Sequence, residues 1–160
     1  VFSEIGYNFE PSEMGASFGL VQLDKFKRFN QQRNRNFKLH LKFFKKMNNF
    51  FIVPKIEKNV KTNFLAYPII LRDKIKFSRK ELQVYLEKKN IQTRPIFSGN
   101  ILRHPAFNKL VSKENKLNSF EKSDYIMQHG LLIGCHQGLS IKDIKYTHTI
   151  IVNFIETFIA

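Results

Sequence analysis

A strand–helix–strand pattern in the middle of the chain is the sequence feature that most restricts the fold. The apolar run Phe64–Leu71 predicts a strand, and Pro68 inside it predicts an edge position or a bulge, because proline cannot donate to a ladder. Ser78 and Glu81 then form a capping box, in which a hydroxyl and a carboxylate bind the free N–H groups at the start of a helix. Behind this helix, the run Ile91–Phe97 predicts a second, short strand.

The carboxy-terminal part of the chain alternates in the same way. A helix is expected over Ser119–Gln128 and a buried strand over Leu131–Cys135. Ser140 and Asp143 provide a second Ser-x-x-acid helix start. The closing helix places on one face the residues Ile141, Ile144, His148, Ile151, Ile155 and Phe158. On such a face, the histidine is expected to be a core or rim residue rather than a ligand. Taken alone, these residues predict an α+β domain with polar loops after its strands.

A long amino-terminal helix is predicted to begin at Ser12. Its first turns are apolar around most of the helix circumference, which predicts burial on most sides. Small residues among them would let another backbone approach closely, as at a domain or subunit contact. The residues concerned are Met14, Gly15, Ala16, Ser17, Phe18, Gly19, Leu20, Val21 and Leu23. From Lys25 to Lys46 the sequence becomes strongly basic with a narrower apolar stripe. This part is either one long helix or two helices joined near Asn30.

The net charge of +14 raises nucleic acid or an acidic membrane surface as partners. The segment Lys25–Lys46 has the charge and the interleaved phenylalanines of a nucleic-acid-binding helix. However, no helix-turn-helix, zinc-finger or RNA-recognition signature accompanies it, and a solvated helix face explains the charge as well. The joint excess of Lys, Asn, Ile and Phe is also typical of an AT-rich coding sequence.

Length and cysteine content bound the remaining possibilities. A chain of 160 residues has room for one ordinary domain with its own core. The single cysteine, Cys135, excludes an intrachain disulfide and fits a reducing cytoplasm. No apolar run approaches the ~18 residues that a membrane span needs. The first residue is Val1 rather than methionine, so we expect a piece of a longer protein.

Residues suited to ligand contact follow the second predicted strand. Ser98-Gly99-Asn100 predicts a turn, and the loop beyond it contains Arg103 and His104. Loops after strands often supply ligand-contacting groups, although an irregular solvated loop would look the same. Several enzyme classes are excluded, because the chain contains no Walker A loop, no Gly-x-Gly-x-x-Gly and no Gly-x-Ser-x-Gly. Its five histidines and its cysteine are not spaced as a metal site, and no acid pair stands out for glycoside chemistry.

Several short motifs, spread over essentially the whole chain, resemble the DegT/DnrJ/StrS family of sugar aminotransferases and dehydrases, which are fold-type-I pyridoxal-phosphate enzymes. They are Gly6-Tyr7-Asn8, Ser12–Ala16, Gly19–Leu23, Arg33-x-x-Asn36-Phe37, Thr93–Asn100 with Pro105-x-Phe107, and Ile126-Met127 with Leu132–Gly134. The central and last motifs resemble the subgroup of 3-dehydrases that make 3,6-dideoxysugars. The resemblance implies the end of the large cofactor domain and a connecting helix over residues 1–49, and a small carboxy-terminal domain over residues 50–160 with a mostly antiparallel sheet covered by helices.

The resemblance also implies roles for individual residues. Asn8 corresponds to the asparagine that reaches the cofactor phosphate of the other subunit in a dimer. Arg94, Asn100 and His136 lie where relatives line the substrate side of the site, and an arginine fork suits a sugar hydroxyl or a diphosphate oxygen. Glu10 replaces an arginine that many relatives have, so one cofactor contact is expected to be absent.

The function implied by the resemblance is that of a pyridoxal or pyridoxamine phosphate enzyme acting on nucleotide-linked 4-keto-6-deoxy sugars, for lipopolysaccharide synthesis in the cytoplasm. Within the family, the Ser98–Asn100 stretch favours 3-dehydration over transamination, with a reductase as a possible partner of a dehydrase. The Schiff-base lysine, or the histidine that replaces it in dehydrases, lies outside this chain, so the fragment alone is expected to be inactive. The alternative is a basic nucleic-acid-binding module that uses the Lys25–Lys46 helix.

Overall fold

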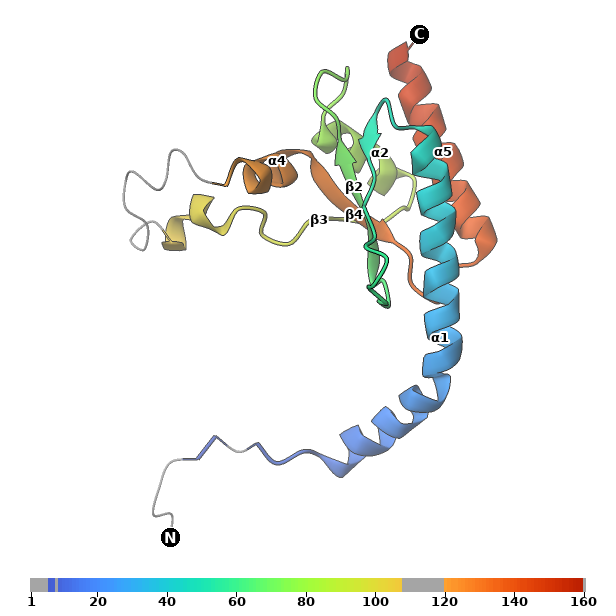
Figure 1. The fold of residues 1–160 in the computed structure, drawn as a ribbon, viewed down its shortest axis with the longest axis vertical. Helices are drawn as coiled ribbons and strands as arrows, with labels where there is room; N and C mark the ends of the chain where they lie inside the picture. The colour runs from blue at the N-terminus through green and yellow to red at the C-terminus, as the bar shows by residue number, and fades with distance from the viewer. Residues whose placement is uncertain (1–5, 8, 108–119, 160) are drawn as a thin grey trace.

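A computed structural model describes residues 6–7, 9–107 and 120–159. In chain order, its elements are α1 (Glu13–Lys46), β1 (Phe51–Ile52), β2 (Ala66–Leu71), α2 (Arg79–Lys88), β3 (Thr93–Pro95), the 3-10 turns η1 (Ile101–Arg103) and η2 (Pro105–Phe107), α4 (Glu121–His129), β4 (Gly130–Gly134) and α5 (Ile141–Ile159). Figure 1 shows α1 and α5 side by side on one side of a small sheet, with α4 on the other side. The basic segment is therefore part of one continuous helix.

The four strands form one antiparallel sheet in the order β1-β2-β4-β3. The chain thus returns late to insert β4 between the two strands that the central sequence pattern predicted. Pro68 was expected at an edge or a bulge, but β2 lies inside the sheet and pairs without interruption with β4, where Pro68 faces Leu132. The proline is tolerated because the two-residue β1 ends opposite Ile70 and leaves no strand beside Pro68 on that side.

The core lies between the sheet and the three helices α1, α2 and α5. Alternate residues of β2 point into it, and these are Tyr67, Ile69 and Leu71. Phe37 and Phe44 of α1 are fully buried against this row, and both rings lie about 5 Å from that of Tyr67 (5.0 and 5.2 Å between centroids). The carboxy-terminal half of α1 is therefore part of the same core as the sheet, and a domain division at Phe50 stays a prediction.

The amino-terminal half of α1 differs from the sequence-based expectation. Its apolar side chains were predicted to be buried on most sides, yet Met14 is 83% and Phe18 is 68% exposed. Figure 1 shows the reason, since this half of the helix extends away from the sheet. An apolar pattern predicts that a helix surface is buried, but it does not say against what. No described part of the chain covers this surface.

Both predicted helix caps form. At α2, the Ser78 hydroxyl accepts from the backbone N–H of Glu81, and the Glu81 carboxylate accepts from the backbone N–H of Ser78. At α5, the same reciprocal pair joins Ser140 and Asp143. These contacts satisfy helix N–H groups that have no partner inside the helix, and they fix where each helix begins.

None of the described helices combines the length and the apolar character needed to cross a bilayer.

The segment after α2 is less regular than predicted. The expected strand over 91–97 is reduced to Thr93–Pro95, because Phe97 adopts a left-handed backbone with a φ of 48° that ends the ladder. The predicted turn at Ser98–Asn100 is confirmed: Gly99 has a φ of 64° and packs against Met127, where a Cβ would come within 2.5 Å of the methionine side chain. The predicted start of the next helix, Ser119, lies outside the described residues, and α4 runs from Glu121.

Candidate functional site

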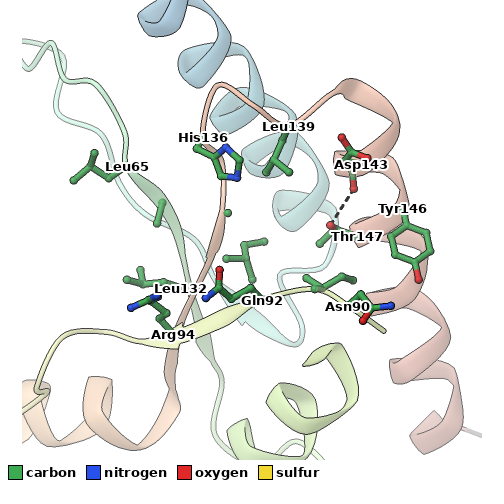
Figure 2. A pocket seen from close by; sticks show the side chains of 14 residues that line it. Leu65, Asn90, Gln92, Arg94, Leu132, His136, Leu139, Asp143, Tyr146 and Thr147 are labelled. Atoms are coloured by element: carbon green, nitrogen blue, oxygen red, sulfur yellow. Dashed lines mark hydrogen bonds between the residues drawn. The ribbon is translucent and has the colours of Figure 1, made fainter. Parts of the chain in front are cut away.

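A cavity of about 540 Å³ opens beside the edge strand β3. Its walls come from the segment Asn90–Arg94, from the middle of β4, from the loop His136–Leu139 and from the first two turns of α5. Figure 2 shows Arg94 and Leu132 on one side and Tyr146 of α5 on the other, with Gln92 and His136 between them. Beside apolar side chains such as Leu65, Leu132 and Leu139, the lining combines one guanidinium, one imidazole, one carboxylate, amides and hydroxyls, which suits a ligand rich in oxygen atoms.

Arg94 reaches the cavity because of the register of β3. It pairs with Leu132 of β4, so its side chain leaves the sheet on the face opposite to that of buried Thr93. Its backbone is fixed by the ladder while the side chain is exposed. A guanidinium in this position offers a planar fork of donors to a phosphate or to a pair of hydroxyls.

His136 reaches the same cavity from the loop that follows β4. Its Nδ1 accepts a hydrogen bond from the backbone N–H of Gly138 at 3.1 Å. The neutral ring therefore has its proton on Nε2, which can donate to a ligand. A Cβ at Gly138 would come within 3.1 Å of the imidazole, so a larger residue there would require the ring to shift.

Asn100 lies apart from the cavity. It is buried, its side-chain oxygen accepts from the backbone N–H of Leu102 at 3.1 Å, and its Nδ2 donates to Asp124 at 2.8 Å. Arg103 also binds Asp124, and the two hydrogen-bond donors lower the pKa of this carboxyl group to about 2. The amide of Asn100 is therefore used to fix the turn before η1, and a role in substrate binding stays a prediction.

Of the four residues chosen from the sequence, two come together. Arg94 and His136 line one cavity, Asn100 does not, and Asn8 lies outside the described residues. Sequence reasoning missed the polar wall formed by Asn90, Gln92, Tyr146 and Thr147. Asp143 was the only residue of this wall that the sequence analysis named, and it was interpreted as a helix cap. Its position could have pointed to Tyr146 and Thr147, because residues three and four positions apart share one face of a helix.

A pair of histidines lies behind the site, between α1 and α5. His40 Nε2 donates to the Gly134 carbonyl at 3.1 Å, so its Nδ1 must accept, and His148 Nε2 donates to it at 3.0 Å. Burial lowers the pKa of His40 to about 4, and burial together with the charge of His40 lowers that of His148 to about 3. His148 is half-buried and stacks on Phe43, which confirms its predicted place in the core or at its rim. The pairing with His40 was not foreseen.

Comparison with known proteins identifies this fold. The chain superposes on the E. coli GDP-4-keto-6-deoxy-D-mannose-3-dehydratase with bound hydrated PLP with a TM-score of 0.76 and 27% identity, over 91% of this chain and 36% of that one. The architecture is thus that of the carboxy-terminal part of a fold-type-I pyridoxal-phosphate enzyme. Residues 1–152 match the DegT/DnrJ/EryC1/StrS aminotransferase family. The chain belongs to this family.

Two curated relatives are similar to nearly the whole of this chain. Lipopolysaccharide biosynthesis protein RfbH of Salmonella typhimurium is 29% identical over 145 residues, which are 91% of this chain and 33% of the relative. The UDP-4-amino-4,6-dideoxy-N-acetyl-beta-L-altrosamine transaminase of Campylobacter jejuni is 27% identical over 153 residues, 96% of this chain and 39% of that enzyme. The chain therefore spans between a third and two fifths of these relatives. The nucleic-acid alternative finds no support among the relatives.

Proposed function

We propose that this chain is the carboxy-terminal part of a pyridoxal or pyridoxamine phosphate enzyme that acts on nucleotide-linked 4-keto-6-deoxy sugars. The observation that supports this function best is the convergence of Arg94 and His136 on one cavity, within a chain that belongs to a family of sugar-modifying enzymes. In this role, Arg94 binds a diphosphate or sugar oxygen, and His136 donates from Nε2 to a sugar oxygen. Both residues bind and orient substrate.

The cavity fits the sugar substrate better than it fits the cofactor. A pyridoxal group needs a lysine amine for covalent attachment, or a base in its place, and an acid beside its ring nitrogen. None of the described residues that line the cavity is a lysine, and its one acid, Asp143, already accepts from the backbone N–H of Ser140 at 2.8 Å. We therefore assign the cofactor to residues outside this cavity, with Asn8 as a contact to its phosphate from the other subunit of a homodimer. When bound, the cofactor supplies an electron sink for cleavage at the sugar carbon.

Between the two reactions of the family, we favour 3-dehydration. The central Ser98-Gly99-Asn100 turn resembles that of the dehydrases, and a 3-dehydratase superposes on this chain at 27% identity. A dehydrase of this kind would work with a reductase, in the cytoplasm, in the synthesis of lipopolysaccharide sugars. Transamination at the same cavity is the second candidate, because a transaminase relative has the same 27% identity.

The test uses the full-length enzyme that contains this chain, with a nucleotide-linked 4-keto-6-deoxy sugar as substrate. Arg94→Gln removes the charged fork from the cavity and is expected to raise KM at least about tenfold, the size of effect that the loss of one charged hydrogen bond produces. Arg79→Gln is the matched control, because Arg79 donates to the Gln128 carbonyl from α2 and does not line the cavity. Equal KM values for the two variants would contradict the assignment of the cavity to the substrate.

A further inference from the structure

Asn36 of α1 is a fully buried amide that contacts the loop beside the cavity. Its Nδ2 donates to the carbonyl of His136 at 2.9 Å and to that of Leu139 at 3.1 Å. These two carbonyls bracket the turn in which the N–H of Leu139 bonds back to His136. A single side chain thus binds both ends of the turn that presents the His136 ring.

Two arginines on the same helix reinforce this contact. Arg35 donates to the Asn36 side-chain oxygen from Nε at 3.1 Å and from Nη2 at 2.9 Å, and Nη2 also reaches the Leu139 carbonyl at 3.2 Å. Arg33 donates from Nε to the Gln137 side-chain oxygen at 2.7 Å. The Arg35 contacts fix which end of the amide faces the loop, because only its NH₂ can donate to carbonyls.

The hydrogen bonds from α1 to the loop come from side chains. The carbonyls of His136 and Leu139 point toward α1, and each accepts from a second donor besides Asn36, which is the N–H of Leu139 for the first and Arg35 Nη2 for the second. The backbone N–H groups in the middle of a helix are already bonded to its own carbonyls, so α1 can supply donors only from side chains. Asn36 donates to both carbonyls at once and so joins the two ends of the turn to the helix.

We propose that Asn36, supported by Arg35, is a positioning residue that fixes the His136–Leu139 turn and so places the His136 imidazole in the cavity. The proposal rests on the proposed function for the part that concerns substrate. Asn36 itself does not line the cavity and acts only through the loop.

The test is Asn36→Asp in the full-length enzyme. The aspartate keeps the size of the side chain and its contact with Arg35, but it turns the two-proton donor into an acceptor facing two carbonyls. We expect amide hydrogen exchange in residues 137–139 to rise at least about tenfold, and KM for the nucleotide-linked keto sugar to rise by a similar factor, with a smaller change in kcat. Asn34→Asp is the matched control, since it adds the same charge to the same helix while its side chain donates only to Asn30.

The two readouts separate this proposal from the proposed function. Exchange in the turn that is as slow in Asn36→Asp as in Asn34→Asp would overturn the positioning role. Faster exchange with an unchanged KM would sustain it and contradict the assignment of the cavity to substrate. If Asn36→Asp does not fold, Arg35→Gln is measured instead, because it removes the support of the amide and one bond to Leu139 from a less buried position. A rise of about threefold in loop exchange is then expected, and no rise would overturn the proposal.

Discussion

At the scale of single residues, two buried polar side chains differ in their hydrogen bonding. The Asn36 amide has hydrogen-bond partners at both ends, since its oxygen accepts from Arg35 and its nitrogen donates to the His136 carbonyl. The hydroxyl of Tyr67, by contrast, is buried with no hydrogen-bond partner among the described residues. Burial of this phenol raises its pKa, because the anion cannot be solvated there. The Tyr67 ring packs against His40 and Phe44, so the described contacts of this side chain are made by its ring rather than by its hydroxyl.

This difference predicts the result of removing hydroxyl groups. Tyr67→Phe deletes an unpaired buried group, so the free energy of unfolding is expected to stay equal or to rise by up to about 1 kcal/mol. Tyr125→Phe deletes a hydroxyl that donates to the Leu71 carbonyl at 2.9 Å, and it is expected to lower the free energy of unfolding by about 1 kcal/mol. Urea unfolding of both variants measures the contrast, and a larger loss for Tyr67→Phe would contradict it.

At the scale of elements, local signals were sufficient where an element is stabilised locally. Both Ser-x-x-acid starts became helix caps, and the apolar run Phe64–Leu71 predicted β2 to within two residues. Strand order was not predictable, because β4 joins β2 through contacts between residues far apart in sequence. Similarly, Asn36 attracted notice only through a family motif, since nothing in its neighbourhood along the chain reveals a loop 100 residues away.

The helix caps give a prediction at this scale. Ser78→Ala removes the acceptor for the Glu81 N–H and is expected to lower the free energy of unfolding by about 1 kcal/mol. Ser12→Ala is its control, because Ser12 occupies the N-cap position of α1 but makes no side-chain cap hydrogen bond. Thermal or urea unfolding should show a near-zero effect for the control. Equal losses in the two variants would mean that the side-chain cap is not the source of the effect.

At the scale of the whole molecule, the His40–His148 pair links α1, α5 and the end of β4, and it couples their packing to pH. Both pKa values are below the ordinary value of 6.5, so the unfolded chain binds more protons than the folded chain between about pH 6.5 and pH 3. The contribution of the two neutral histidines to the free energy of unfolding is therefore fully present above pH 6.5, and it is lost as the pH is lowered through this window. For His40, the loss is on the order of 3 kcal/mol.

A variant isolates this pH dependence. His148→Gln retains an N–H donor for His40 Nδ1 but removes one titrating group, so the stability curve between pH 6.5 and pH 4.5 should become flatter. Asp124 has a pKa of about 2 and loses its contribution only at lower pH, which separates the two effects. Urea unfolding over this pH range is the measurement. A variant with the slope of the parent protein would show that other groups cause the pH dependence.

The continuity of α1 has a geometric consequence for the site. One helix of 34 residues has exposed apolar side chains around Phe18 at one end and, from Asn36, fixes the loop of His136 nearer the other. These two residues are about 27 Å apart along the axis, at 1.5 Å per residue. A change of about 5° in the helix direction between them would displace one relative to the other by about 2 Å, more than the tolerance of a hydrogen bond. The alignment of the cavity with anything bound at the far end of α1 is therefore set by the angle of the bend that Figure 1 shows in the amino-terminal part of this single helix.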